Sequence, residues 1–397
     1  MSWQSLLNPD IQEFITAHEK DDIAALALKK PPVADWDYKL ILDQIKSRQK
    51  ARQKIPLWLT HHKNIIFPPP DLLEQASSAA TARYKAGLIQ GQNFVDLTGC
   101  CGIDTCAFTE HFTNGTCIEK DKSAASLLAH NLTLLSSVPV EIINTSAENF
   151  IKTMPPLDVA LIDPQRRDSN QKGKYRFEDC APNILSLLPN LLEKTRTVIV
   201  KTSPMLDITQ GIATLESTGA SAREVHCIQW RSECKEVLFI LNNNTKTMPA
   251  IIAVSLDDSG NPLYEMRFTQ EEEKTCRAPL SQPLSYLYEP GPAFQKSGGF
   301  NMIAPKYAVH KLAPQTHLYT SDEWVADFPG RSFEIIGQYP PKAEKIPLKQ
   351  AHITVRNFPI NAPTLRKKLK IKDGGQDYLF ACTLANGTKT MLHAQKI

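Results

Sequence analysis

Several common signatures are missing from this chain of 397 residues. No run of eighteen apolar residues occurs, so we expect no membrane-spanning helix and no membrane partner. The first residues, MSWQSLLNPDIQEF, lack the basic start and the apolar stretch of a signal peptide. We therefore expect a cytoplasmic protein.

The nine cysteines show no metal-binding spacing. Cys100 and Cys101 are adjacent, and no second Cys or His pair complements them, so we expect no metal site. Free thiols in a reducing compartment are the simplest interpretation. The G-x-G-x-x-G turn of dinucleotide folds and the G-K-[ST] of phosphate loops are absent as well, which argues against those two ligand classes.

The net charge is only +3, so any basic surface must be local. Residues 341–397 contain eleven Lys and Arg but only three Asp and Glu. Within them, LRKKLKIK predicts an amphipathic helix, and we expect Lys367, Lys368 and Lys370 to contact a phosphate backbone. The alternative is an ordinary solvated helix face.

The pattern of apolar residues divides the chain into three parts. Residues 1–90 carry apolar side chains at helical intervals and predict a helical N-terminal domain. Residues 91–245 alternate short β-branched runs with helical stretches, which is typical of an α/β, Rossmann-like parallel sheet. Residues 246–397 predict an α+β module, in which a hairpin is followed by a Pro- and Gly-rich region and then strand, helix and hairpin.

The stretch FVDLTGCCGID reads as a strand, a glycine turn and a helix start. Gly99 and Gly102 let the backbone approach a ligand closely, ahead of a helix N-terminus. Glu119 ends the next strand, where a carboxylate can accept hydrogen bonds from both hydroxyls of a ribose. The pattern therefore predicts a site for a nucleoside-containing cofactor.

Four motifs in this region resemble those of class I S-adenosylmethionine-dependent methyltransferases: VDLTGCCGID, CIEKD, NTSAENF and LIDPQRRD. The resemblance implies S-adenosylmethionine as cofactor. It places Asp96 near the methionine amino group, Glu119 on the ribose, Ser146 and Ala147 at the adenine edge and Asp163 at the methyl group. The turn that holds the cofactor would comprise Thr98, Gly99, Cys100 and Gly102, although Cys100 stands where the family usually has glycine.

Further along, the chain resembles a bacterial group of methyltransferases with a C-terminal THUMP-like domain, related to RNA guanine-N2 methyltransferases. LYEPGPAFQKSGGF, DFPGRSFEI and LRKKLKIKDGGQDYLFA carry this second resemblance. It implies a structured RNA, such as rRNA or tRNA, as the partner.

Two acceptors are compatible with the fourth motif. Enzymes that methylate amino groups of bases use [DN]-P-P-aromatic, and this chain has Asp163-Pro164-Gln165-Arg166. Gln165 would hydrogen-bond a base edge, and Arg166 would stack on the base through its guanidinium plane. The second proline and the aromatic ring are missing, so the match is partial.

The other acceptor is a ribose 2′-hydroxyl, which needs a base. Lys85, Asp163, Lys201 and Glu236 are similar in order and spacing to the Lys-Asp-Lys-Glu tetrad of ribose 2′-O-methyltransferases. In that reading a buried lysine beside a second cation has a lowered pKa and accepts the proton.

The arginines after the fourth motif have two readings. Arg166 and Arg167 would face phosphates of the acceptor, or they would pair with nearby acids such as Asp168 and only order the loop.

We thus expect a methyltransferase that acts on structured RNA, at a base amino group or a ribose 2′-hydroxyl. Two alternatives stay open at this point: an RNA-binding protein whose methyltransferase fold has lost activity, and a methyltransferase for small molecules.

Overall fold

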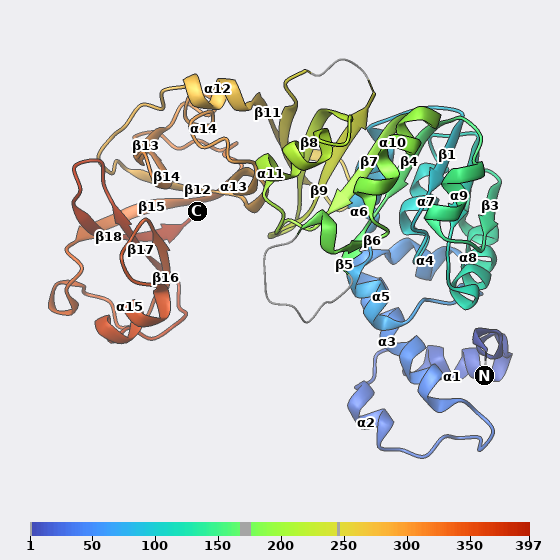
Figure 1. Ribbon diagram of the computed structural model, residues 1–397. Coiled ribbons are helices and arrows are strands. Elements are labelled where there is room, and N and C mark those ends of the chain that lie inside the picture. Colours follow the sequence, from blue (N-terminus) through green and yellow to red (C-terminus); the bar gives the residue numbers. More distant parts are fainter. Residues whose placement is uncertain (1, 167–175, 244–246) are drawn as a thin grey trace. The chain divides into compact units, whose positions relative to one another are not determined.

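The chain folds into two units and contains two large β-sheets. The computed structural model describes residues 2–166, 176–243 and 247–397 (Figure 1). The first unit comprises Met1–Val225, Lys235–Thr247 and Leu256–Pro262, and the second comprises His226–Cys234, Met248–Ser255 and Leu263–Ile397.

The N-terminal region is helical up to Gly87. Asn8 and Asp37 cap two of its helices, because their side chains accept hydrogen bonds from free N–H groups of the first turn. Ile15 and Ile45 are completely buried in the apolar core between these helices. The elements are η1 Trp3–Leu7, α1 Pro9–His18, α2 Ile23–Ala27, α3 Tyr38–Lys54, α4 Pro56–His61, α5 Pro70–Gln75 and α6 Ala79–Gly87.

The larger sheet has nine strands, in the order β11-β10-β8-β9-β7-β4-β1-β2-β3, and its strands β7, β4, β1, β2 and β3 belong to the first unit. The five strands from β3 to β7 pair in parallel, and β9 pairs antiparallel to β7. The strands are β1 Asn93–Asp96, β2 Asn114–Ile118, β3 Val140–Ile143, β4 Leu157–Ile162, β7 Thr195–Thr202, β8 Ser221–Trp230, β9 Glu233–Asn242, β10 Ala250–Leu256 and β11 Pro262–Thr269.

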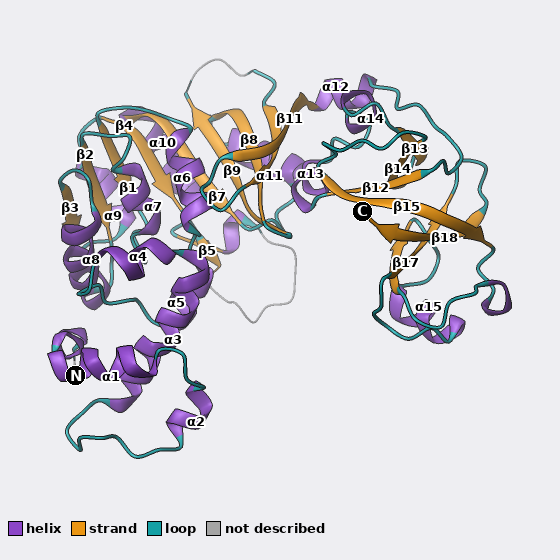
Figure 2. Cartoon of the chain, turned by 180° about the vertical axis from the view of Figure 1, so that it is seen from behind, coloured by secondary structure: helices purple, strands orange, loops and turns teal. Residues whose placement is uncertain are grey.

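Helices connect the parallel strands and cover the sheet (Figure 2). Their apolar sides pack on strands that are almost completely buried, such as the Val198–Val200 run of β7. The helices are α7 Ile103–Phe108, α8 Lys122–Leu135, α9 Ala147–Thr153, α10 Ile184–Lys194 and α11 Ile208–Glu216. A short ribbon of β5 Gln165–Arg166 and β6 Cys180–Ala181, with η2 Phe177–Asp179 before β6, follows β4.

The strand order reverses between β1 and β4. From β1 the chain proceeds outward through β2 and β3, and then returns to the other side of β1 with β4. Ligands of open α/β sheets bind at this reversal, outside the carboxyl ends of the strands. Asp96 ends β1 here, Glu119 follows β2, and Asp163 follows β4.

The second unit holds a seven-stranded sheet in the order β13-β14-β12-β15-β18-β17-β16. Arg356 on the edge strand β16 donates to Glu289 on β12 at 2.6 Å, although four steps of the sheet order separate the two strands. The sheet therefore curls. Its strands are β12 Tyr286–Pro290, β13 His310–Ala313, β14 Thr316–Ser321, β15 Gly330–Tyr339, β16 His352–Arg356, β17 Asp377–Thr383 and β18 Lys389–Lys396.

Helices accompany this sheet, and α15 Ala362–Leu369 buries Leu365 and Leu369 in an apolar cluster with β16–β18 residues. The other helical elements are α12 Gln270–Thr275, α13 Pro292–Ser297, α14 Ile303–Lys306 and η3 Ala343–Lys345.

The predicted fold class is confirmed: a Rossmann-like α/β sheet follows a helical N-terminal region and precedes an α+β module. The boundaries at 90 and 245 stay a prediction, since β10 and β11 lie beyond residue 245 yet continue the first sheet. In the part of the chain that the structure describes, no helix is both long and apolar enough to cross a membrane.

Candidate active site

The turn after β1 is packed directly against β2. Gly102 adopts a φ of 74° and Cys100 a φ of 45°, so both have left-handed backbone. A Cβ atom on Gly99 would come within 2.4 Å of Cys117 Sγ, a contact that no real side chain makes. The backbone of the turn therefore lies as close to the second strand as glycine allows.

Asp96 is buried beneath this turn with 2% of its surface exposed. Its carboxylate accepts hydrogen bonds from the Thr105 hydroxyl at 2.7 Å and from the Thr98 backbone N–H at 3.0 Å. Burial raises the pKa of Asp96 to about 6, and these hydrogen bonds oppose the rise only in part. The carboxylate is thus ionised at neutral pH and becomes protonated in mild acid.

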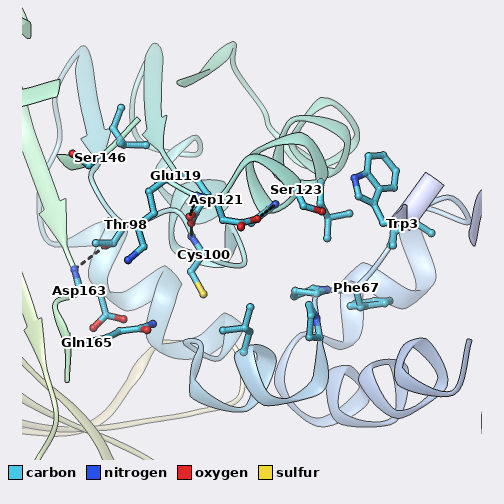
Figure 3. Close-up of a pocket in the computed structure, with 18 of the residues that line it drawn as sticks. Trp3, Phe67, Thr98, Cys100, Glu119, Asp121, Ser123, Ser146, Asp163 and Gln165 are labelled. Atoms are coloured by element: carbon cyan, nitrogen blue, oxygen red, sulfur yellow. Dashed lines mark hydrogen bonds between the residues drawn. The ribbon is translucent and has the colours of Figure 1, made fainter. Parts of the chain in front are cut away.

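Glu119 joins two of the strand-end loops. One of its oxygens accepts the Cys100 N–H at 3.1 Å, and the other accepts the Asp121 N–H at 2.9 Å. The next strand end adds Ser146, which caps α9 by accepting the Asn149 N–H, and Ala147. The loops after β1 and β2 are thus joined through the Glu119 carboxylate, and the start of α9 after β3 lines the same cavity (Figure 3).

These loops and the N-terminal helices enclose a cavity of about 550 Å³. Asp163 and Gln165 lie together at one end of it, with Thr98 and Cys100 beside them, while Trp3 and Phe67 lie toward the other end (Figure 3). The volume falls within the range of small-molecule and cofactor sites. Within the described residues, the charged side chains of the lining are mostly acidic; they are Asp43, Glu119, Lys120, Asp121, Glu148 and Asp163.

A cluster of charges, mostly buried, lies beside the end of the cavity that Asp163 lines. Lys201 Nζ donates to Asp163 Oδ2 at 2.5 Å. Lys85, with no exposed surface, contacts Glu236 at 2.8 Å and Asp104 at 3.1 Å. The cluster brings together residues from α6, α7, β7, β9 and the loop after β4.

The electrostatics of the cluster favour the charged forms of Lys201 and Asp104. Burial lowers the pKa of Lys201, but the carboxylates of Asp163, Asp104 and Glu236 outweigh burial and raise it above its ordinary value. Burial raises the pKa of Asp104, and Lys85 and Lys201 outweigh it and hold that pKa below the ordinary value. Lys201 is therefore an ammonium at neutral pH.

Comparison with known proteins agrees with this geometry. The chain is 28% identical to a proposed methyltransferase from Porphyromonas gingivalis W83, whose crystal structure aligns over 100% of this chain and 99% of that one with a TM-score of 0.85. Uncharacterized S-adenosylmethionine-dependent methyltransferases from two strains of Mycobacterium tuberculosis are 22% identical over 315 residues, 76% of this chain and 80% of theirs. Residues 286–329 match a family described as a ferredoxin-like domain, and residues 330–396 match one described as THUMP domain-like.

The chain is a class I S-adenosylmethionine-dependent methyltransferase with a C-terminal THUMP-like domain.

The cavity of the methyltransferase fits this cofactor. A carboxylate at the end of β2, backbone N–H groups of a glycine turn and a helix start at Ser146 are the groups that hold an adenosine and an amino acid. The residues that would hold it are Asp96, Thr98, Gly99, Cys100, Gly102, Glu119, Ser146 and Ala147, and these assignments stay predictions.

The four residues of the predicted tetrad, Lys85, Asp163, Lys201 and Glu236, do meet in space. The expected lowering of a lysine pKa by a second cation is wrong, however, because carboxylates contact both ammonium groups. The pKa of Lys201 moves upward instead. Lys85 has no exposed surface through which to reach an acceptor.

The remaining predicted residues of this region lie along the ribbon after β4. Pro164 is buried, the Gln165 side chain is exposed and lines the cavity, and Arg166 is half-buried and pairs in β5 with Cys180 of β6. Arg167 lies outside the described residues. On the second unit, Lys367, Lys368 and Lys370 are exposed at the end of α15.

Sequence reasoning missed Asp104 and Ser77. Asp104 binds Lys85, and the Ser77 hydroxyl donates to Asp104 at 2.8 Å and accepts from Lys85 at 3.0 Å. An acid in the first turn of the helix after the glycine turn was a visible signal. Ser77 carried no such signal, because Asp104 is distant in sequence and Lys85 lies near the far end of the following helix, α6.

Replacement of Cys100 by glycine tests whether the cavity needs the thiol. Because a φ of 45° favours glycine, Cys100→Gly is expected to keep S-adenosylhomocysteine affinity within about threefold and to raise unfolding free energy by up to about 1 kcal/mol. Calorimetric titration and denaturant unfolding measure both. Gly99→Ala is the control, and it should abolish binding through the clash with Cys117. Loss of affinity in Cys100→Gly would show that the thiol contacts the cofactor.

The raised pKa of Asp96 predicts opposite pH dependences for stability and binding. Protonated Asp96 stabilises the ligand-free fold below its unfolded pKa of 3.8, and this contribution is lost as pH rises through about 6. Cofactor affinity should do the reverse and weaken below about pH 6, since only the carboxylate attracts an ammonium group. Titrations with S-adenosylhomocysteine across this range check it, and Asp96→Asn should bind weakly without an inflection there. An unchanged affinity for the unaltered protein down to about pH 5 would contradict the role of Asp96.

Proposed function

We propose that this methyltransferase modifies an exocyclic amino group of a base in a structured RNA. S-adenosylmethionine, when bound, supplies an electrophilic methyl group on its sulfonium. The protein then has to position a nucleophile against that group and accept the proton that the nucleophile loses.

The observation that carries the choice of acceptor is the ion pair between Asp163 and Lys201. Oδ2 of Asp163 is held by the ammonium, and within the described residues Oδ1 accepts no hydrogen bond. A carboxylate with one free oxygen at the cavity can accept an amino N–H, orient the nitrogen lone pair and take up the proton.

A ribose hydroxyl fits this site less well. A hydroxyl is a weak acid and needs a neutral lysine or an equally strong base. Lys201 is instead charged, because three carboxylates raise its pKa, and Lys85 is enclosed. Positive charge on Lys201 does suit an amine acceptor, since the ammonium group fixes the orientation of the Asp163 carboxyl group.

The THUMP-like domain supports RNA as the acceptor. Its match over residues 330–396 includes the exposed Lys367, Lys368 and Lys370, which can neutralise phosphates. Two of these lysines lie on the exposed side of α15, whose apolar side is packed in the core of the second unit. Cations on a rigid element are suited to fixing the register of a nucleic acid.

The methylated product distinguishes the two acceptors. Total RNA from a strain that lacks the protein is incubated with the enzyme and labelled S-adenosylmethionine and then hydrolysed in alkali. Methylation of a base leaves every linkage cleavable, so the label should appear in mononucleotides. Label in alkali-resistant dinucleotides, which a 2′-O-methyl group produces, would contradict the proposal.

Lys201→Arg adds a matched variant to this assay. Arginine keeps the positive charge beside Asp163 but does not release its proton at any usable pH. We expect it to retain activity within about tenfold of the unaltered enzyme, whereas a mechanism with Lys201 as base would lose about 10²–10⁴-fold.

Salt dependence tests the RNA partner separately. Replacing Lys367, Lys368 and Lys370 together by alanine should weaken RNA binding and reduce the slope of log affinity against log salt by about 2 to 3. The control replaces three exposed lysines of the N-terminal helical region, Lys20, Lys29 and Lys30, and should leave the slope unchanged. Equal slopes for both triple variants would argue for a small-molecule acceptor.

A further inference from the structure

The segment Phe67–Ser77 forms part of the lining of two neighbouring cavities. Phe67, Pro68, Pro69 and Leu72 line the large cavity, and Gln75, Ala76 and Ser77 line a smaller one next to it. Asp163 and Gln165 line both cavities. A piece of the N-terminal region thus forms a wall of the space into which the strand-end carboxylate projects.

Buried polar side chains hold the start of this segment in place. The Gln44 amide donates to Phe67 O at 3.2 Å and accepts from Phe67 N at 3.0 Å. Asn131 makes the same pair of bonds to Ile66, and the Ser47 hydroxyl donates to Pro68 O at 2.7 Å. Because these partners satisfy the backbone as a neighbouring strand would, the segment is rigid without belonging to a sheet.

The other end is equally constrained. Lys54 Nζ donates to Leu73 O at 3.0 Å and to Ala76 O at 2.8 Å, and so satisfies free carbonyls at the end of α5. Ser77 ties the segment to Asp104 and Lys85 of the charge cluster. With both ends fixed, Leu72 and Gln75 have defined positions beside the cleft.

The fourth motif lacks the second proline and the aromatic ring, and the segment Phe67–Ser77 offers other side chains that can contact a base. Gln165 and Arg166 stand where amino-group methyltransferases of the [DN]-P-P-aromatic type have a proline and a ring. Leu72 offers an apolar surface in the cavity that contains Asp163. Gln75 offers an amide at the smaller cavity; its side chain and that of Gln165 are exposed, and among the described residues neither amide has a hydrogen-bonding partner within the protein.

The charge of the cavity limits what can enter. Among the residues that the structure describes, the lining has five carboxylates, at Asp43, Glu119, Asp121, Glu148 and Asp163, and one lysine, Lys120. A phosphate would be repelled from such a lining, whereas a neutral base with an amino group is not. A base turned out of its stack can enter while the sugar–phosphate chain stays outside.

We propose that Leu72 and Gln75 complete the acceptor pocket: a nucleobase packs against Leu72, and its edge is read by the amides of Gln75 and Gln165 while its amino group faces Asp163. This inference rests on the proposed function, because it assumes an RNA base as acceptor. It assigns base recognition to the N-terminal region as well as to the methyltransferase sheet.

The test compares Leu72→Ala and Gln75→Ala with Leu28→Ala, whose leucine is 90% exposed and lines neither cavity. Methyl transfer to total RNA from the strain that lacks the protein gives kcat/KM, and calorimetry gives S-adenosylhomocysteine affinity. We expect each pocket variant to lose about tenfold in kcat/KM, chiefly through KM, with cofactor affinity unchanged. Leu28→Ala should behave like the unaltered enzyme.

Leu72→Met, which keeps an apolar surface of similar size, should recover most of the activity. Unchanged kcat/KM in both alanine variants would overturn this inference but leave the proposed function standing. A parallel loss of cofactor affinity would do the same, since it would place Leu72 and Gln75 at the cofactor. Absence of transfer to RNA by the unaltered enzyme would overturn the proposed function and this inference with it.

Discussion

The site depends on the ion pair between Lys201 and Asp163. Lys201 lies near the end of β7 and Asp163 just after the end of β4, and these two strands are parallel neighbours. Lys201 is buried and the Asp163 side chain is partly buried, so each charge offsets part of the hydration that the other has lost. The surrounding carboxylates keep Lys201 protonated, and Lys201 keeps Asp163 oriented with one oxygen free. In the proposed function, that free oxygen is the group that accepts the proton from the amine.

The two sides of the cavity are held in place by different interactions. On the sheet side, the glycine turn, Asp96 and Glu119 are held by backbone hydrogen bonds and by packing so tight that Gly99 cannot carry a side chain. On the helical side, the Phe67–Ser77 segment is held by side chains from α3 and α8. A nucleoside cofactor fits the first side, and we propose that the second side contacts the methyl acceptor.

The sequence predicted those features that local patterns encode. Short β-branched runs, acids at strand ends and the glycine turn are contiguous signals, and they located Asp96, Glu119 and Asp163 at one edge of a parallel sheet. It did not predict the direction of the Lys201 pKa, because that depends on three carboxylates from separate elements. Nor did it reveal that Gln44 and Asn131 position Phe67 and Ile66, or that β10 and β11 extend the first sheet, since long-range packing decides both.

A crystal structure of the protein with S-adenosylhomocysteine bound would test the account most directly. The account predicts both ribose hydroxyls on the Glu119 carboxylate, the adenine beside Ser146 and Ala147, and the sulfur at the end of the cavity where Asp163 and Gln165 lie. It also predicts that the space bordered by Leu72 stays open beside the sulfur. A ligand bound elsewhere, or a cleft filled by side chains of the Phe67–Ser77 segment, would contradict it.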